Sequence, residues 1–187
     1  DDIRNICEKY GDNIKYSKNP NPSQINNIIR LTELAQGEYI KFLFDDDLLH
    51  PFCVQYLLES LEETRDKNTK VAFSPRNFIN ERNKITNYIN YFKVDRSLFV
   101  LPGRDYIRLT AINHVNLIGE YSTAMFRKED CFDDDQTFCL YRLKDGYFPG
   151  TLDLSAWVEI AQHGNFVAHP QVLSYFRQHS NSSSNHK

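Results

Sequence analysis

Apolar residues recur along the chain at two different spacings, and the segments that show them alternate. Spacings of three and four residues indicate helices with one apolar face at 2–10, 24–36, 51–65, 103–113 and 151–164. Short runs rich in aromatic and β-branched residues indicate strands at 14–17, 39–44, 71–74, 121–126, 166–168 and 172–176. Helices that alternate with strands predict an α/β fold with a mostly parallel central sheet and helices on both of its faces.

The helix predicted at 51–65 has a regular apolar stripe, formed by Val54, Leu57, Leu58 and Leu61. Residues 77–92 are polar and rich in Asn, with apolar residues on either side of a turn-like segment at 81–84. This pattern indicates an antiparallel hairpin, with an irregular surface loop as the alternative.

The length of 187 residues predicts a single domain over 1–179, followed by a flexible Ser- and Asn-rich tail at 180–187. The chain opens on a helix, whereas α/β domains with a nucleotide site normally begin with a strand. We therefore expect the domain to be partial at its amino end, with its first strands upstream of Asp1.

The composition excludes several classes of protein. A net charge of −3 with scattered basic residues gives no support for nucleic-acid binding. No apolar stretch approaches the roughly 18 to 20 residues of a membrane span, and the start does not resemble a signal peptide. The four cysteines lack the spacing of a zinc site or a disulfide framework. We expect a cytoplasmic domain, with peripheral membrane association as an alternative.

Three acidic residues, Asp45, Asp46 and Asp47, follow the strand predicted at 39–44. Ligands of open α/β sheets bind at the carboxyl ends of strands, and clustered carboxylates repel one another unless a cation or basic group neutralises them. A magnesium-like ion takes one or two carboxylates and completes its shell with water and phosphate. The segment therefore indicates a metal with a phosphorylated ligand, and a solvated turn that caps the next helix is the alternative.

The segment from Gly37 to Pro51 resembles the acidic "DXD" segment of family 2 glycosyltransferases. The resemblance implies a GT-A-like nucleotide-diphospho-sugar transferase fold. It also implies that Asp47 binds a divalent cation, Mn²⁺ or Mg²⁺, which bridges the diphosphate of a nucleotide-sugar donor. Asp45 or Asp46 would lie by the ribose and the sugar, and the resemblance leaves open which of the two contacts the donor.

Asp153 lies in the first turn of the helix predicted at 151–164, where a carboxylate by itself indicates only a stabilised helix start. However, Asp-x-x-x-Trp followed by a short helix, Gly, a strand, Pro and Arg177-Gln178-His179 resembles the end of the same family's domain. This second resemblance implies that Asp153 is the general base, that Arg177 neutralises the diphosphate and that His179 reaches the metal.

Together these segments predict an inverting glycosyltransferase that moves a sugar onto a saccharide or lipid-linked acceptor, in the synthesis of surface polysaccharide or another glycan. A non-catalytic carbohydrate-binding or assembly module with the same fold is the alternative. A phosphatase with an aspartyl nucleophile is disfavoured, because it would need Thr or Val where this chain has Leu49. If Asp153 is not the base, Glu120 is the next candidate.

Overall fold

The structure is a computed structural model that describes residues 2–141 and 151–179. The chain divides into two compact units, Asp1–Ala35 and Gln36–Lys187. The single domain over 1–179 stays a prediction, because a division by contacts does not by itself separate two folding units. The tail expected at 180–187 lies outside the described residues.

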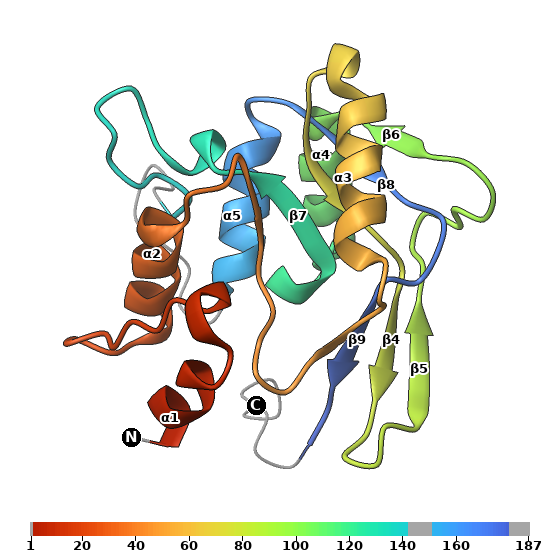
Figure 1. The fold of residues 1–187 in the computed structure, drawn as a ribbon. Helices are drawn as coiled ribbons and strands as arrows, with labels where there is room; N and C mark the ends of the chain where they lie inside the picture. The colour runs from red at the N-terminus through yellow and green to blue at the C-terminus, as the bar shows by residue number, and fades with distance from the viewer. Residues whose placement is uncertain (1, 142–150, 180–187) are drawn as a thin grey trace. The chain divides into compact units, whose positions relative to one another are not determined.

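The first unit contains two helices, α1 (Asp2–Glu8) and α2 (Gln24–Leu34) (Figure 1). Both were expected, but the apolar face predicted for α1 is not buried within the unit, since Ile3 and Ile6 are more than half exposed. The strand predicted at 14–17 is wrong, because these residues are irregular and pair with no other strand of the described chain.

α2 begins where the sequence indicates. The hydroxyl of Ser23 accepts a hydrogen bond from the main-chain N–H of Asn26 at 3.1 Å, which satisfies one of the free donors of the first turn. Inside the helix, Thr32 donates to the carbonyl of Ile28 at 2.8 Å, and both residues are buried. The helix ends at Leu34, before the Gly37 that the sequence suggested.

The second unit contains a five-stranded sheet with the order β1-β7-β3-β8-β6. Its strands are, in that order, β1 (Tyr39–Lys41), β7 (Ala124–Arg127), β3 (Thr69–Phe73), β8 (Asn165–Ala168) and β6 (Phe99–Leu101). The β3–β8 pair is parallel, and the other three neighbouring pairs are antiparallel.

This pairing corrects the expectation of a mostly parallel sheet, although the α/β class itself is confirmed. β1, β3 and β8 point the same way, but β7 lies between β1 and β3 and runs against both. β6 likewise runs against β8 at the edge. Periodicity along a sequence predicts that strands and helices alternate, but it carries no information on which strand inserts between two others.

A second sheet has the order β2-β9-β4-β5, formed by β2 (Leu48–Leu49), β9 (Ser174–Arg177), β4 (Arg76–Ile79) and β5 (Ile85–Ile89). β4 and β5 form the predicted antiparallel hairpin. Its turn is held by Asn80, whose side-chain oxygen accepts from the N–H groups of Arg82 and Lys84. β9 runs parallel to β4 and antiparallel to β2, so it joins the segment after the acidic triplet to the hairpin (Figure 1).

Three helices cover the five-stranded sheet: α3 (Cys53–Glu63), α4 (Gly103–Asn113) and α5 (Leu152–Ala161). α3 packs on the face that carries Ala72, Met125 and Val167. On the opposite face, Trp157 of α5 packs against Phe126, and Tyr106 of α4 packs against Phe166. Helices on both faces were predicted from the sequence and are confirmed.

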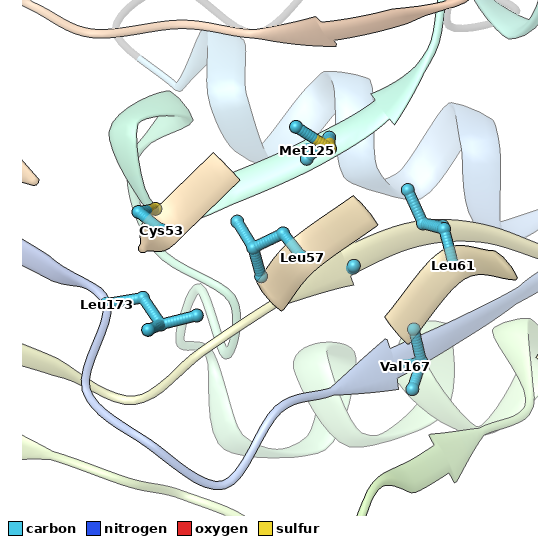
Figure 2. Packing of buried hydrophobic residues seen from close by; sticks show 7 residues of the cluster. Cys53, Leu57, Leu61, Met125, Val167 and Leu173 are labelled. Carbon is cyan, nitrogen blue, oxygen red and sulfur yellow. The ribbon is translucent and has the colours of Figure 1, made fainter. Parts of the chain in front are cut away.

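The buried face of α3 consists of Cys53, Leu57 and Leu61 (Figure 2). The stripe predicted for this helix is only half right, because Val54 and Leu58 are 51% and 37% exposed. Residues four apart share a helix face, so Cys53 continues the line of Leu57 and Leu61, while Val54 and Leu58 lie on its flank.

Leu57→Ala should lower the free energy of unfolding by about 2 to 5 kcal/mol, because the side chain is fully buried and its removal leaves a cavity. Leu58→Ala is the matched control on the same helix and should cost less than about 1 kcal/mol. Denaturant unfolding followed by circular dichroism measures both. Equal losses would show that the buried face of α3 is misplaced.

Candidate active site

The acidic triplet lies in a loop between the two sheets of the second unit. β1 ends at Lys41, earlier than the strand predicted to Phe44, and the chain is irregular until β2 begins at Leu48. The N–H of Phe44 donates to the hydroxyl of Ser122 at 3.2 Å. Along the triplet, Asp45 is exposed, Asp46 is half-buried and Asp47 is buried.

Arg177, at the end of β9, holds this loop. Its main-chain N–H donates to Asp47 Oδ1 at 3.0 Å, and its Nε donates to the carbonyl of Asp46 at 2.7 Å. Its Nη1 donates to the carbonyl of Asn80, in the turn of the β4–β5 hairpin, at 2.7 Å. His179 Nε2 lies 3.1 Å from Asp46 Oδ2. The pairing of β2 with β9 therefore brings together four of the predicted site residues, and the guanidinium of Arg177 links the acidic loop to the hairpin turn.

Asp47 Oδ2 is buried, and no described residue makes a well-formed hydrogen bond to it. Burial raises the pKa of the Asp47 carboxyl, although the nearby hydroxyl of Ser122 and the N–H of Arg177 oppose the shift. The ammonium group of Lys41 lies beneath the loop and donates to the carbonyls of Ser122 and Phe42 at 2.5 and 3.1 Å. Burial lowers its pKa to about 8.

The acidic loop supplies only part of a coordination shell for a divalent cation. Among residues 2–141 and 151–179, no group of three or more His, Cys, Asp or Glu side chains is arranged to hold a metal. An unpartnered buried carboxylate oxygen, however, is the kind of atom that a hard cation coordinates. Asp47, with Asp46 beside it, thus fits a cation that takes one or two carboxylates and completes its shell with phosphate oxygens, rather than an all-protein site.

Asp153 lies in the first turn of α5, as predicted. Its Oδ1 accepts from the N–H of Leu154 at 2.8 Å, and its Oδ2 accepts from Asn116 Nδ2 at 3.0 Å. Burial raises the pKa of the Asp153 carboxyl, while its hydrogen bonds and the positive charge of Arg76 oppose the shift. A partly buried carboxylate with a raised pKa is a reasonable acceptor for a proton at neutral pH.

Glu120 and Arg76 form a buried ion pair beside Asp153. Arg76 Nε lies 2.9 Å from Glu120 Oε2, and Arg76 Nη1 donates to the carbonyl of Ile118 at 2.9 Å. Burial raises the pKa of Glu120, the charge of Arg76 opposes this shift, and the charge of Asp153 adds to it. The charge of Glu120 also acts on Asp47. Glu120 thus couples electrostatically to both the predicted metal ligand and the predicted base.

Sequence reasoning named Glu120 but missed Arg76 and Asn116. Arg76 is only 5% exposed, which is unusual for an arginine, yet it stands as a single charge in a polar segment. Asn116 lies in an irregular segment after α4 and belongs to no motif. Neither residue type nor spacing distinguishes them, because their roles arise from contacts with residues distant in the sequence.

Residues 1–144 match the sequence model of a known family, described as Glycosyl transferase family 2. Asp45, Asp46, Asp47 and Glu120 lie within the matched residues, whereas Asp153, Arg177 and His179 lie beyond them. No curated protein matches the chain. In the part of the chain that the structure describes, no helix is long and apolar enough to cross a membrane.

Proposed function

The chain belongs to glycosyltransferase family 2, with a mixed α/β fold of the GT-A-like kind, and from this premise we propose that it inverts the anomeric centre of the sugar that it transfers. The donor is a nucleotide-diphospho-sugar, and the acceptor is a hydroxyl of a saccharide or a lipid-linked saccharide. The single observation that carries the proposal is the buried Asp47 carboxylate, whose Oδ2 has no well-formed hydrogen bond and which lies beside Asp46, Arg177 and His179.

The donor binds at the acidic loop. Asp47 would hold a divalent cation, Mn²⁺ or Mg²⁺, with Asp46 and His179 beside it, and the cation would supply positive charge that favours the departure of the diphosphate. Asp45 is exposed next to these groups and is free to contact the ribose or the sugar. Because the Arg177 N–H occupies Asp47 Oδ1, Oδ2 is the oxygen that would contact the cation.

Asp153 acts as the general base. It accepts the proton of the acceptor hydroxyl while that oxygen attacks the anomeric carbon on the face opposite the diphosphate. The bond to the diphosphate breaks as the new glycosidic bond forms, so the configuration inverts. Because the proton moves only as the bond forms, the carboxylate needs reach and orientation more than high basicity.

We place this activity in the synthesis of surface polysaccharide or a related glycan, which is the setting that the sequence resemblance implies, and in the cytoplasm, which is the expectation from the hydropathy of the sequence. The acceptor decides between these products. Once a nucleotide-sugar that binds the protein is known, a screen of saccharide and lipid-linked acceptors tests the proposed acceptor class. Transfer to none of them would contradict it.

Nucleotide-diphospho-sugars should raise the melting temperature of the protein in the presence of Mn²⁺, whereas Mn²⁺ alone should have little effect. The reason is that phosphate oxygens complete a shell for which the protein supplies only one or two carboxylates. At a ligand concentration about 100 times its Kd the gain is about 2.7 kcal/mol, which thermal unfolding resolves easily.

The panel should contain several nucleotides and sugars, with the free nucleoside diphosphates as controls. It should be run on the protein expressed from its complete gene. Micromolar affinity for Mn²⁺ without nucleotide would contradict a coordination shell that needs phosphate oxygens of the nucleotide. Binding of saccharides with no response to any nucleotide-sugar would instead support a non-catalytic carbohydrate-binding module.

A further inference from the structure

The side chain of Asn116 is held in one orientation. Its Oδ1 accepts from the N–H of Gly119 at 2.9 Å, and its Nδ2 donates to the carbonyl of the same residue at 3.0 Å. Since the oxygen must face an N–H group, the amide cannot be turned over without losing this bond. The second hydrogen of Nδ2 therefore faces Asp153 Oδ2, 3.0 Å away.

The turn that holds Asn116 is itself fixed from two sides. Gly119 has a positive φ of 100°, and a Cβ added there would lie 2.4 Å from Cζ of Arg76, so the backbone packs directly on the guanidinium. On the other side, the carbonyl of Gly119 accepts from Trp157 Nε1 at 2.8 Å. Trp157 is fully buried on α5, the helix that carries Asp153.

These contacts make one connected unit of β4, the turn and α5. Arg76 anchors the turn from β4, Trp157 anchors it from α5, and Asn116 extends from it to the carboxylate of Asp153. The side chain of Asn116 is already ordered, because its donors and its acceptor are all used. It therefore loses little conformational entropy when Asp153 binds a substrate.

We propose that Asn116 is a positioning residue for sugar transfer: by donating to Asp153 Oδ2 it fixes the plane of the carboxylate, so that a remaining lone pair of Asp153 is directed at the acceptor hydroxyl. The inference rests on the proposed function, in which Asp153 is the base. A carboxylate has about four lone-pair sites, and two of those on Asp153 are used by Leu154 and Asn116.

Other groups also act on Asp153, and the test must separate them from Asn116. Among the described residues, the charged groups that act on Asp153 are Arg76 on β4 and Glu120, which precedes the 3-10 helix at Tyr121–Thr123. Three tyrosines, Tyr106 on α4, Tyr121 and Tyr141, also interact with its charge, and burial raises the pKa of each, so they remain neutral. A change at Asn116 that preserves its volume leaves these groups in place.

Asn116→Asp is the decisive variant. The new carboxylate keeps the size of the amide and can still accept from Gly119, but an oxygen then faces Asp153 Oδ2 where a donor stood. We expect kcat to fall by about 10- to 100-fold near neutral pH, because this is the change in rate that corresponds to the loss of a hydrogen bond to a charged group. The acid limb of the pH profile should move to higher pH, and donor affinity should stay unchanged.

Asn113→Asp is the matched control. Asn113 is exposed at the end of α4, and its Nδ2 donates only to the carbonyl of Leu109 among the contacts described, so the same charge is added nearby without contact to Asp153. This control should leave transfer unchanged. A fall equal to that of Asn116→Asp would show a general effect of added charge and would overturn the proposal.

Two further variants keep the test conclusive. Asn116→Ser removes the amide N–H without adding charge, and the shorter serine hydroxyl does not extend as far towards Asp153. If Asn116→Asp does not fold, Asn116→Ser should lower kcat and leave the affinity for the nucleotide-sugar intact. Equal losses of kcat and donor affinity in Asn116→Ser would show a merely structural role and overturn the inference. Asp153→Asn, assayed in parallel, reports on the base itself: transfer retained there defeats the proposed function, whereas transfer lost there but normal in Asn116→Asp defeats only the inference.

Discussion

Asp153→Asn should lower sugar transfer by roughly 100-fold or more while it leaves donor binding and the fold intact. The amide has nearly the same size and its oxygen can still accept from the N–H of Leu154, but it cannot take a proton from the acceptor. Transfer is measured by release of the nucleoside diphosphate with donor and acceptor present, and donor binding by thermal unfolding. Both assays use the protein expressed from its complete gene.

The stability of this variant follows from the raised pKa of Asp153. A carboxyl whose pKa is higher in the folded than in the unfolded chain favours folding at low pH, and this contribution is lost as pH rises through the folded pKa. At neutral pH the ionised carboxylate therefore costs stability, which offsets the one hydrogen bond, to Leu154 or to Asn116, that the amide cannot accept. Asp153→Asn should therefore change the melting temperature little. Near-normal transfer would mean that Asp153 is not the base, and Glu120→Gln would be assayed next.

Asp47→Asn should remove the effect of Mn²⁺ on donor binding. The neutral side chain can still accept from the N–H of Arg177, so the loop keeps its anchor. The substitution removes the negative charge of Asp47 and replaces one of its two oxygens with an NH₂ group, which cannot bind a cation. We expect the affinity for the nucleotide-sugar in the presence of Mn²⁺ to fall at least about 10-fold, to the level measured with a chelator. Titration followed by thermal unfolding or calorimetry measures the change.

Asp135→Asn is the control for Asp47→Asn. Asp135 is exposed and belongs to a second run of three acidic residues, Asp133, Asp134 and Asp135. Its substitution should change neither donor affinity nor the response to Mn²⁺. If Asp47→Asn keeps a normal response to Mn²⁺, the metal site is placed on the wrong residue. The two active-site variants thus differ in kind, since one loses catalysis and the other loses cation-dependent binding.

Helices of the second unit could be predicted from the sequence more closely than its sheets. α4 spans the predicted residues, and α3 and α5 lie within two or three residues of their predicted ends, because apolar residues at helical spacing report directly on one buried face. Strand pairing depends on residues far apart, so the place of β7 between β1 and β3 could not be predicted. Residues 14–17 have the apolar residues of a strand, but their backbone joins neither sheet of the described chain.

The candidate site divides in the same way. The acidic triplet stands out because it follows a predicted strand, but Asp47 within it, like Arg177 and His179, could be singled out only because its segment resembles a family. The approach of Arg177 and His179 to the acidic loop depends on the pairing of β2 with β9, which no local pattern indicates. Arg76 and Asn116 are single polar residues, whose partners become clear only when the tertiary contacts are known.

The pairing of β2 with β9 also bears on the order in which the protein folds. Contacts between distant parts of a chain form late, because closing a long loop costs entropy before the contact stabilises anything. A nascent chain that has emerged only through β3 already contains Asp47 but not the N–H group of Arg177 that holds it. Such a chain lacks the Arg177 anchor of its acidic loop, so the proposed donor site should form only after synthesis has passed β9.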